Sequence, residues 1–119
     1  MVTDDVAAAR DEFRYQFAPY FANPVYNRFL GSTGYAREAA AIREAAVAKE
    51  WARARAALHD ELVDSIAVIG DRQHCQDRMR RYTDAGIGTP MLYCLSDDPD
   101  VQRHTFAAFA PAEFRSCHD

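Results

Sequence analysis

The chain has 119 residues, of which 49% are apolar, and it carries a formal net charge of −4 at pH 7. This length suits one small domain, and the apolar content argues against disorder throughout. No basic face of the kind that nucleic acid requires is apparent, so we expect no nucleic-acid partner. No run approaches the ~18 apolar residues of a membrane span, and the acidic start MVTDDVAAARDEF lacks the pattern of a signal peptide.

The cysteines are odd in number and widely spaced, which does not predict a disulfide framework. They are Cys75, Cys94 and Cys117. A reducing cytoplasm fits this pattern best.

The first third of the chain predicts two helices. Thr3-Asp4-Asp5 is typical of a helix start, because a capping hydroxyl and carboxylates favour the positive end of the helix dipole. The apolar face of this helix is formed by Val6, Phe13, Phe17 and Tyr20. Asn23-Pro24 should end it, and Pro24 is well placed to open a second helix. The second helix carries Val25, Tyr26, Phe29 and Leu30.

A glycine-rich break, Gly31-Ser32-Thr33-Gly34, follows the second helix. Two glycines around hydroxyls can expose backbone N–H groups to a phosphate, but no strand precedes them and no P-loop lysine follows, so we interpret the segment as a linker. Residues 35–58 are alanine-rich and predict helix. The apolar stripe shifts near Lys49-Glu50, which predicts a break there, and Trp51 is expected to anchor the second part.

Residues 60–70 allow two interpretations. Acids at positions 60, 61 and 64 favour a helix that begins at Asp60, with Gly70 as its left-handed C-cap. Branched residues at 66, 68 and 69 favour instead a buried strand over residues 65–69. Local physical chemistry leaves this choice open.

The remaining elements are predicted by their end signals. Asp71 caps a helix whose buried stripe is Cys75, Met79 and Tyr82 and which stops at Gly86. The continuous apolar run Met91–Leu95 is the pattern of a strand covered on both faces. Asp98 and Pro99 then open a last helix, which ends at Pro111. We expect residues 112–119 to be a disordered or frayed tail.

Few residues suggest chemistry, and each has a structural explanation. No HExxH or CxxC motif occurs, so no metal site is predicted from the histidines or cysteines. Asp60, Glu61 and Asp64 could supply an acid–base pair, but a dipole-favoured helix start explains them better. Arg78, Arg80 and Arg81 are interpreted as a solvated helix face rather than a phosphate contact. The aromatic residues of the first two helices could stack on a ring system, but their helical spacing favours core packing.

Two long segments together resemble a known family. The wording DELVDSIAVIGDRQHCQDRMRRYTDAGIGTPMLY is similar to the carboxy-terminal end of the luciferase-like monooxygenases, which are flavin- and deazaflavin-dependent oxidoreductases. The upstream segment DDVAAARDEFRYQFAPYFANPVYNRFLGSTGY resembles the family's Ala/Arg helix, its Tyr–Pro–Tyr segment and a following glycine. The resemblance runs from about Thr3 to about Pro111, and it favours helix over strand for residues 60–69.

The resemblance implies a (β/α)8 barrel, which needs about 250 residues. The chain would then begin at the end of the seventh strand, Met1-Val2, and residues 1–111 would form the last βα units, with Met91–Leu95 as the eighth strand. The expected fold is therefore mainly α with one β-strand, a carboxy-terminal fragment of a barrel that is predominantly helical in isolation. Barrel active sites lie at the carboxyl ends of the strands, so Ser96 and Asp97 would lie on the rim of the pocket.

These implications limit the expected function. Most of the flavin pocket would lie in the missing first six strands, so the catalytic residues are unknown and neither FMN nor a deazaflavin coenzyme is expected to bind this chain tightly. The unpaired strand predicts a homo-oligomer or a partner that supplies the missing amino-terminal barrel portion. The first hypothesis is a segment of a flavin- or deazaflavin-dependent oxidoreductase that is inactive alone. The alternatives are a helical oligomerisation or protein-interaction module derived from that family, and a small-ligand binder between the helices.

Overall fold

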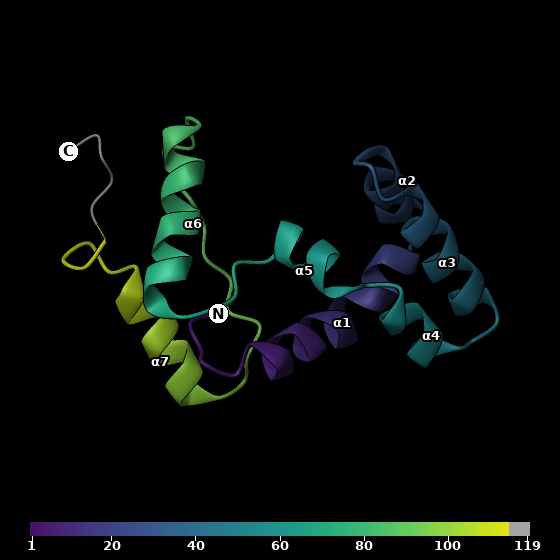
Figure 1. The fold of residues 1–119 in the computed structure, drawn as a ribbon, viewed down its shortest axis with the longest axis horizontal. Helices are drawn as coiled ribbons and strands as arrows, with labels where there is room; N and C mark the ends of the chain where they lie inside the picture. Colours follow the sequence, from purple (N-terminus) through teal and green to yellow (C-terminus); the bar gives the residue numbers. More distant parts are fainter. Residues whose placement is uncertain (115–119) are drawn as a thin grey trace. The chain divides into compact units, whose positions relative to one another are not determined.

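The structure is a computed structural model that describes residues 1–114, and it is mainly helical (Figure 1). The described part of the chain forms seven helices: α1 Val6–Ala22, α2 Pro24–Ser32, α3 Ala36–Val47, α4 Trp51–Ala56, α5 Asp60–Ile66, α6 Arg72–Asp84 and α7 Pro99–Ala108. The only β pairing within residues 1–114 is an isolated parallel bridge between Val2 and Gly70.

Side-chain caps begin the helices close to the predicted positions. Asp71 Oδ1 accepts a hydrogen bond from the His74 N–H at 2.8 Å, and Asp98 Oδ1 accepts one from the Asp100 N–H at 2.8 Å. At the start of α1 the cap is Asp5, whose Oδ1 accepts from the Ala8 N–H at 3.0 Å. Thr3 lies one step earlier, where its hydroxyl accepts from the Asp5 N–H at 3.1 Å. The predicted helix starts are therefore confirmed, although Asp5 and not Thr3 holds the first turn of α1.

The predicted break in the alanine-rich segment is confirmed. Helix α3 ends at Val47, α4 begins at Trp51, and Lys49 between them has a φ of 60°. Trp51 remains 38% exposed, whereas Ala54 and Leu58 are fully buried. Alanine and leucine, more than the indole ring, therefore anchor this part of the chain.

The choice between helix and strand at residues 60–69 is settled in favour of helix for Asp60–Ile66, which is α5. The prediction that Gly70 is the C-cap is wrong, because the helix ends at Ile66 and its C-cap is Ala67, which is extended with φ −93° and ψ 148°. Gly70 instead has a φ of 150° and pairs with the amino-terminal segment. This positive φ explains why glycine occupies the position.

The predicted strand Met91–Leu95 is wrong, because this segment has no strand pairing in the structure. Its apolar side chains are also not covered on both faces, since Met91 is 95% exposed and Tyr93 is 79% exposed. A strand needs a continuous ladder of backbone hydrogen bonds with a neighbour, and no such ladder forms at residues 91–95 in the described part of the chain.

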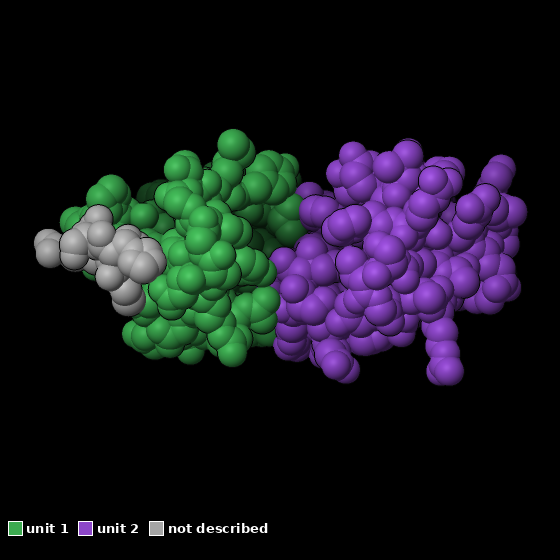
Figure 2. Space-filling model, turned by 90° about the horizontal axis from the view of Figure 1, so that it is seen from above, with its two compact units in different colours: residues 1–9, 68–119 green, residues 10–67 purple. Residues whose placement is uncertain are grey.

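The chain forms two compact units, residues 10–67 and residues 1–9 with the chain from Val68 onward (Figure 2). In residues 10–67, α3 packs against α2 and α4 around large buried side chains. These include Phe13, Leu30, Ile42, Leu58, Leu62 and Val63. In the other unit α6 packs against α7, with Cys75, Met79 and Ala108 buried.

Two further expectations concern the chain end and membranes. Within the predicted tail, Glu113 pairs with Arg72 and the Phe114 ring contacts Phe109, while residues 115–119 lie outside the described part. Among the described helices, none combines the length and the apolar character that a membrane crossing requires.

Candidate functional site

The predicted rim residues Ser96 and Asp97 lie directly before α7. The Ser96 hydroxyl accepts a hydrogen bond from the Asp98 N–H at 3.1 Å, and the Ser96 carbonyl oxygen accepts one from Gln102 Nε2 at 2.8 Å. Asp97 is exposed. Both of these hydrogen bonds thus stabilise the first turns of α7, and the assignment of Ser96 and Asp97 to a pocket rim stays a prediction.

Thr105 of α7 joins the two segments that the resemblance assigns to neighbouring strands. Its hydroxyl oxygen accepts a hydrogen bond from the Val2 N–H at 2.9 Å and from Cys94 Sγ at 3.8 Å. Thr105 is only 4% exposed. The amino-terminal segment and the segment 91–95 therefore meet at one buried hydroxyl, without a ladder of backbone hydrogen bonds.

The amino-terminal segment is held on its other side by residues 68–70. The Thr3 N–H donates to the Gly70 carbonyl oxygen at 2.9 Å, and the Gly70 N–H donates to the Met1 carbonyl oxygen at 3.3 Å. The Met1 amino group donates to the Val68 carbonyl oxygen at 2.6 Å. Burial lowers the pKa of this amino group, and the nearby thiols Cys75 and Cys94 act in the opposite direction.

Cys75 is fully buried beneath this segment. Its thiol donates to the carbonyl oxygens of Gly70 at 3.4 Å and Met1 at 3.5 Å. Burial raises the pKa of the Cys75 thiol, so the nucleophilic thiolate is disfavoured. Cys75 therefore acts as a packed, hydrogen-bonded side chain rather than as a reactive nucleophile.

The acids at the start of α5 are engaged by arginines of α1. Arg10 makes a two-pronged contact with Asp64, with Nε 2.9 Å from Oδ1 and Nη2 2.6 Å from Oδ2, and its Nη1 lies 3.1 Å from Asp60 Oδ2. Arg14 also pairs with Asp60, and its Nε donates to the Leu58 carbonyl oxygen at 2.6 Å.

These contacts change how the acids are interpreted. The hydrogen bond from Arg14 lowers the pKa of Asp60, so this carboxyl group is a poor proton donor near neutral pH. The acids hold α5 against α1, a role beyond the dipole effect that the sequence suggested. The sequence carried one signal for this contact: Arg10 and Arg14 are spaced i, i+4, and so are Asp60 and Asp64.

The aromatic residues of α1 and α2 stack on one another. The Phe13 and Phe17 rings are parallel with centroids 4.4 Å apart, and the Tyr20 and Tyr26 rings stack at 3.8 Å. A hydrogen bond with Tyr26 raises the pKa of Tyr20. Core packing, the favoured interpretation, holds for Phe13, which is 2% exposed, but not for Tyr20 and Tyr26, which are 43% and 38% exposed and stack on each other at the surface.

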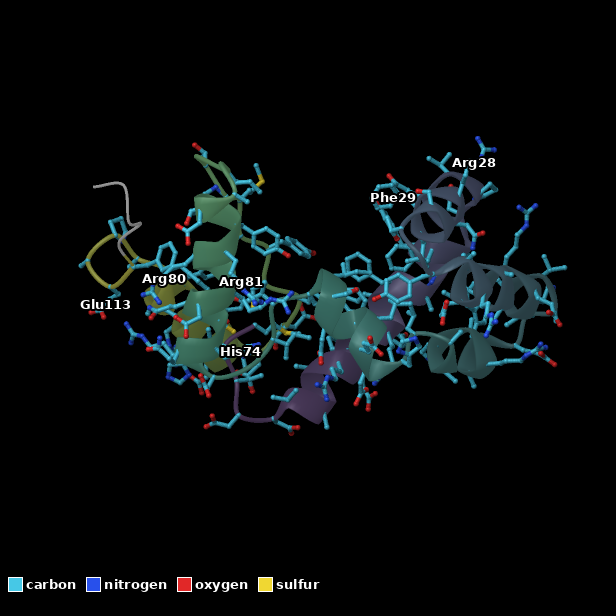
Figure 3. All side chains as sticks on the ribbon, turned by 45° about the horizontal axis from the view of Figure 1, so that its top comes forward. Arg28, Phe29, His74, Arg80, Arg81 and Glu113 are labelled. Atoms are coloured by element: carbon cyan, nitrogen blue, oxygen red, sulfur yellow. The ribbon has the colours of Figure 1, made fainter. Side chains whose placement is uncertain are left out.

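The remaining candidates are spread along the chain. In residues 1–114 no three His, Cys, Asp or Glu side chains are grouped so that they could hold a metal ion, and Cys117 and His118 lie outside this range. The hydroxyls of Ser32 and Thr33 bond carbonyl oxygens of their own helix, those of Phe29 and Leu30. Figure 3 shows Arg80 and Arg81 on α6, where Arg80 pairs with Asp77 at 2.7 Å.

Comparison with known proteins gives one match. The family model described as luciferase-like monooxygenase matches residues 1–89. No curated protein and no solved structure matches the chain. The matched part ends before Met91, so it covers α1 to α6 but not the segment 91–95 or α7. The match spans most of the sequence, and the chain therefore belongs to the luciferase-like monooxygenase family, whose members depend on flavin.

Proposed function

We propose that this chain is the carboxy-terminal segment of a flavin- or deazaflavin-dependent luciferase-like oxidoreductase, and that it is redox-inactive alone. The family match over residues 1–89 is the observation that carries the proposal. A (β/α)8 barrel takes about 250 residues and closes only when every strand has two neighbours. The described residues supply helices and one isolated bridge, which fits the last part of such a barrel and not the whole.

The residues present do not fit a flavin. In the family the bound ring supplies hydride transfer or oxygen activation, and the protein positions the ring and excludes water. Here the Ser96 hydroxyl is already bonded to the Asp98 N–H, and Asp97 carries an exposed carboxylate, which would repel the phosphate of a flavin. The stacked rings of α1 and α2 are occupied by one another. No catalytic step is therefore assigned to this chain.

Titration with FMN and with a reduced deazaflavin tests this proposal. We expect no saturable change in flavin absorbance or fluorescence at micromolar protein. Saturable micromolar binding would overturn the claim that the chain is inactive alone. In that event the variants S96A and D97N would show whether the predicted rim contributes, with S32A, a hydroxyl on α2, as the matched control.

The DNA beside the coding sequence provides an independent test. An upstream reading frame that encodes six βα units, in frame or as a separate gene, is the expected finding. Flanking DNA without such units would contradict the fragment proposal and would favour the second function.

The second candidate is a helical oligomerisation or protein-interaction module derived from the same family. Exposed apolar side chains favour it, because Met91 and Tyr93 are 95% and 79% exposed and Val25 and Phe29 on α2 are 71% and 65% exposed. Figure 3 shows Phe29 and Arg28 projecting from α2 on different sides. Val25 and Phe29 lie one turn apart on α2, and exposed apolar residues that form a contiguous patch commonly mark sites of association.

Sedimentation velocity at several concentrations tests the module. We expect the average mass to rise with concentration, and the charged variant Y93K to reduce this rise. Tyr15→Lys, which alters a tyrosine that is 68% exposed on α1, is the matched control. A compact monomer throughout the micromolar range would contradict self-association.

A further inference from the structure

His59 lies at the junction of α4 and α5, and both of its ring nitrogens have partners. Nδ1 accepts a hydrogen bond from the Leu62 N–H at 3.3 Å, so the imidazole is the N-cap of α5. Nε2 lies 3.4 Å from Glu38 Oε1 on α3. The Tyr35 ring, just before α3, lies 6.2 Å from the imidazole, measured between centroids.

These contacts define one protonation state of the ring. A nitrogen that accepts from an N–H must present its lone pair, so Nδ1 carries no hydrogen. The neutral ring then carries its hydrogen on Nε2, which donates to Glu38. An imidazolium has hydrogens on both nitrogens, so its Nδ1–H would face the Leu62 N–H and the cap would be lost.

We propose that His59 is a proton-controlled cap, which holds the first turn of α5 when neutral and releases it on protonation while keeping its contact with Glu38. Histidine changes charge between about pH 5 and 8, which covers the range that cells use for signalling. Serine, threonine, aspartate and asparagine are the usual capping residues, and none of them loses its acceptor oxygen in this range.

Charged groups face His59 from three elements. Glu38 of α3 faces Nε2, and Asp60 follows His59 at the start of α5. Arg14 of α1 pairs with Asp60, and the positive end of the α5 dipole lies at Nδ1. Protonation therefore ends the hydrogen bond from the Leu62 N–H of α5 and leaves His59 in an ion pair with Glu38 of α3.

The release is confined to the first turn of α5. The side chains of Leu62 and Val63 are fully buried, and Arg10 holds Asp64 in the second turn through two hydrogen bonds. The Arg14 contact keeps the pKa of Asp60 below its ordinary value of 3.8, so this pair stays intact at pH 5. A pH change from 8 to 5 thus acts on the cap and leaves the other contacts of α5 in place.

Amide hydrogen exchange at Leu62, corrected for the intrinsic pH dependence, tests the proposal. We expect protection at Leu62 to fall roughly fivefold between pH 8 and pH 5, the size typical of losing an N-cap. The nitrogen-15 shift of His59 Nδ1 should change over the same range, from the value of an unprotonated ring nitrogen to that of an N–H. Unchanged protection, or an Nδ1 that carries hydrogen at pH 8, would overturn the proposal.

Two variants separate the cap from other titrating groups. H59N supplies an amide oxygen that caps without titrating, so its Leu62 protection should be the same at both pH values. An equal fall in H59N would overturn the proposal, because another group would then be responsible. E38Q removes the carboxylate that faces Nε2 and leaves Nδ1 able to accept from the Leu62 N–H, so Leu62 protection at pH 8 should match that of the wild type. Lower protection in E38Q at pH 8 would overturn the proposal, because the contact with Glu38 and not the lone pair of Nδ1 would then hold the first turn.

Discussion

The side-chain amide of Asn27 donates a hydrogen bond to the Ala39 carbonyl oxygen at 2.7 Å and so joins α2 to α3. The same nitrogen donates to the Phe21 carbonyl oxygen at 3.0 Å, near the end of α1. Asn27 is only 8% exposed, so water cannot readily replace these bonds. One side chain thus ties three helices of residues 10–67 together.

The variant N27A should therefore lower the free energy of unfolding by about 1–3 kcal/mol, because two buried hydrogen bonds are lost. N27D should cost more, since a carboxylate would face two carbonyl oxygens. Urea unfolding followed by circular dichroism measures both changes. S32A on the same helix, where the exposed hydroxyl bonds only the Phe29 carbonyl oxygen, should change stability by less than about 0.5 kcal/mol. Equal effects of N27A and S32A would contradict this role of Asn27.

Features that depend on adjacent residues could be predicted from the sequence. The caps Asp71 and Asp98 follow from the preference of short acidic side chains for helix starts, and the break at Lys49 follows from a shift of the apolar stripe. Each of these signals is local, because the residues that interact are separated by only a few positions.

Features that need a distant partner could not be predicted in the same way. The run Met91–Leu95 has the composition of a buried strand, but a strand forms only where another backbone can pair with it. The Arg10–Asp64 contact joins residues 54 positions apart, and the sequence offered only matching spacings. The assignment of Ser96 and Asp97 to a pocket rim depends on strands that the described chain does not contain.

Gly70 offers a test of backbone geometry. Its φ of 150° is a conformation that residues with a Cβ rarely adopt, and a Cβ there would lie 2.8 Å from His74 Cδ2. We expect G70A to lower the free energy of unfolding by about 1–3 kcal/mol, mainly through the cost of this φ. Thermal unfolding measures the loss.

Two further variants identify the cause of that loss. Adding H74A to G70A removes the close side chain and should restore little stability, because the exposed imidazole of His74 can rotate away from the added Cβ. G86A provides a comparison, since Gly86 has a φ of 101° and no atom within 4 Å of an added Cβ. Full rescue by H74A would show that the contact, and not the backbone angle, requires glycine at position 70.

The Arg14–Asp60 pair predicts how stability depends on pH. The hydrogen bond from Arg14 lowers the pKa of Asp60 below 3.8, so the folded state binds the Asp60 proton less readily than the unfolded state does. The stabilisation is complete above the unfolded pKa and is lost as pH falls through the lower folded pKa. The stability difference between the wild type and D60N should therefore be constant above about pH 5 and shrink below about pH 4.

Urea midpoints from pH 7 to pH 2.5 measure this difference. R14Q removes the main cause of the lowered pKa of Asp60. The stability difference that D60N causes should therefore depend less on pH in the R14Q background than in the wild type. A difference that does not vary with pH would mean that Asp60 gains nothing from Arg14 in solution.

The two cysteines of the described chain should react at different rates. Cys75 is fully buried, and burial raises the pKa of its thiol, whereas Cys94 is partly exposed beside Thr105. Because the thiolate is the reacting species, iodoacetamide should modify Cys94 well before Cys75. The variant C117S removes the third thiol, and mass spectrometry of the digested protein identifies the modified residue.

Denaturant provides the control for that experiment. Cys75 should become reactive only at urea concentrations that unfold the residues around α6, since its thiol is covered by the amino-terminal segment and donates to Met1 and Gly70 carbonyl oxygens. The variant T105V removes the hydroxyl that accepts from the Val2 N–H, so it should loosen this segment and speed the modification of Cys75. If Cys75 and Cys94 reacted at equal rates in the wild type without urea, the amino-terminal segment would not cover Cys75 in solution, and the contacts assigned to Thr105 would not hold it in place.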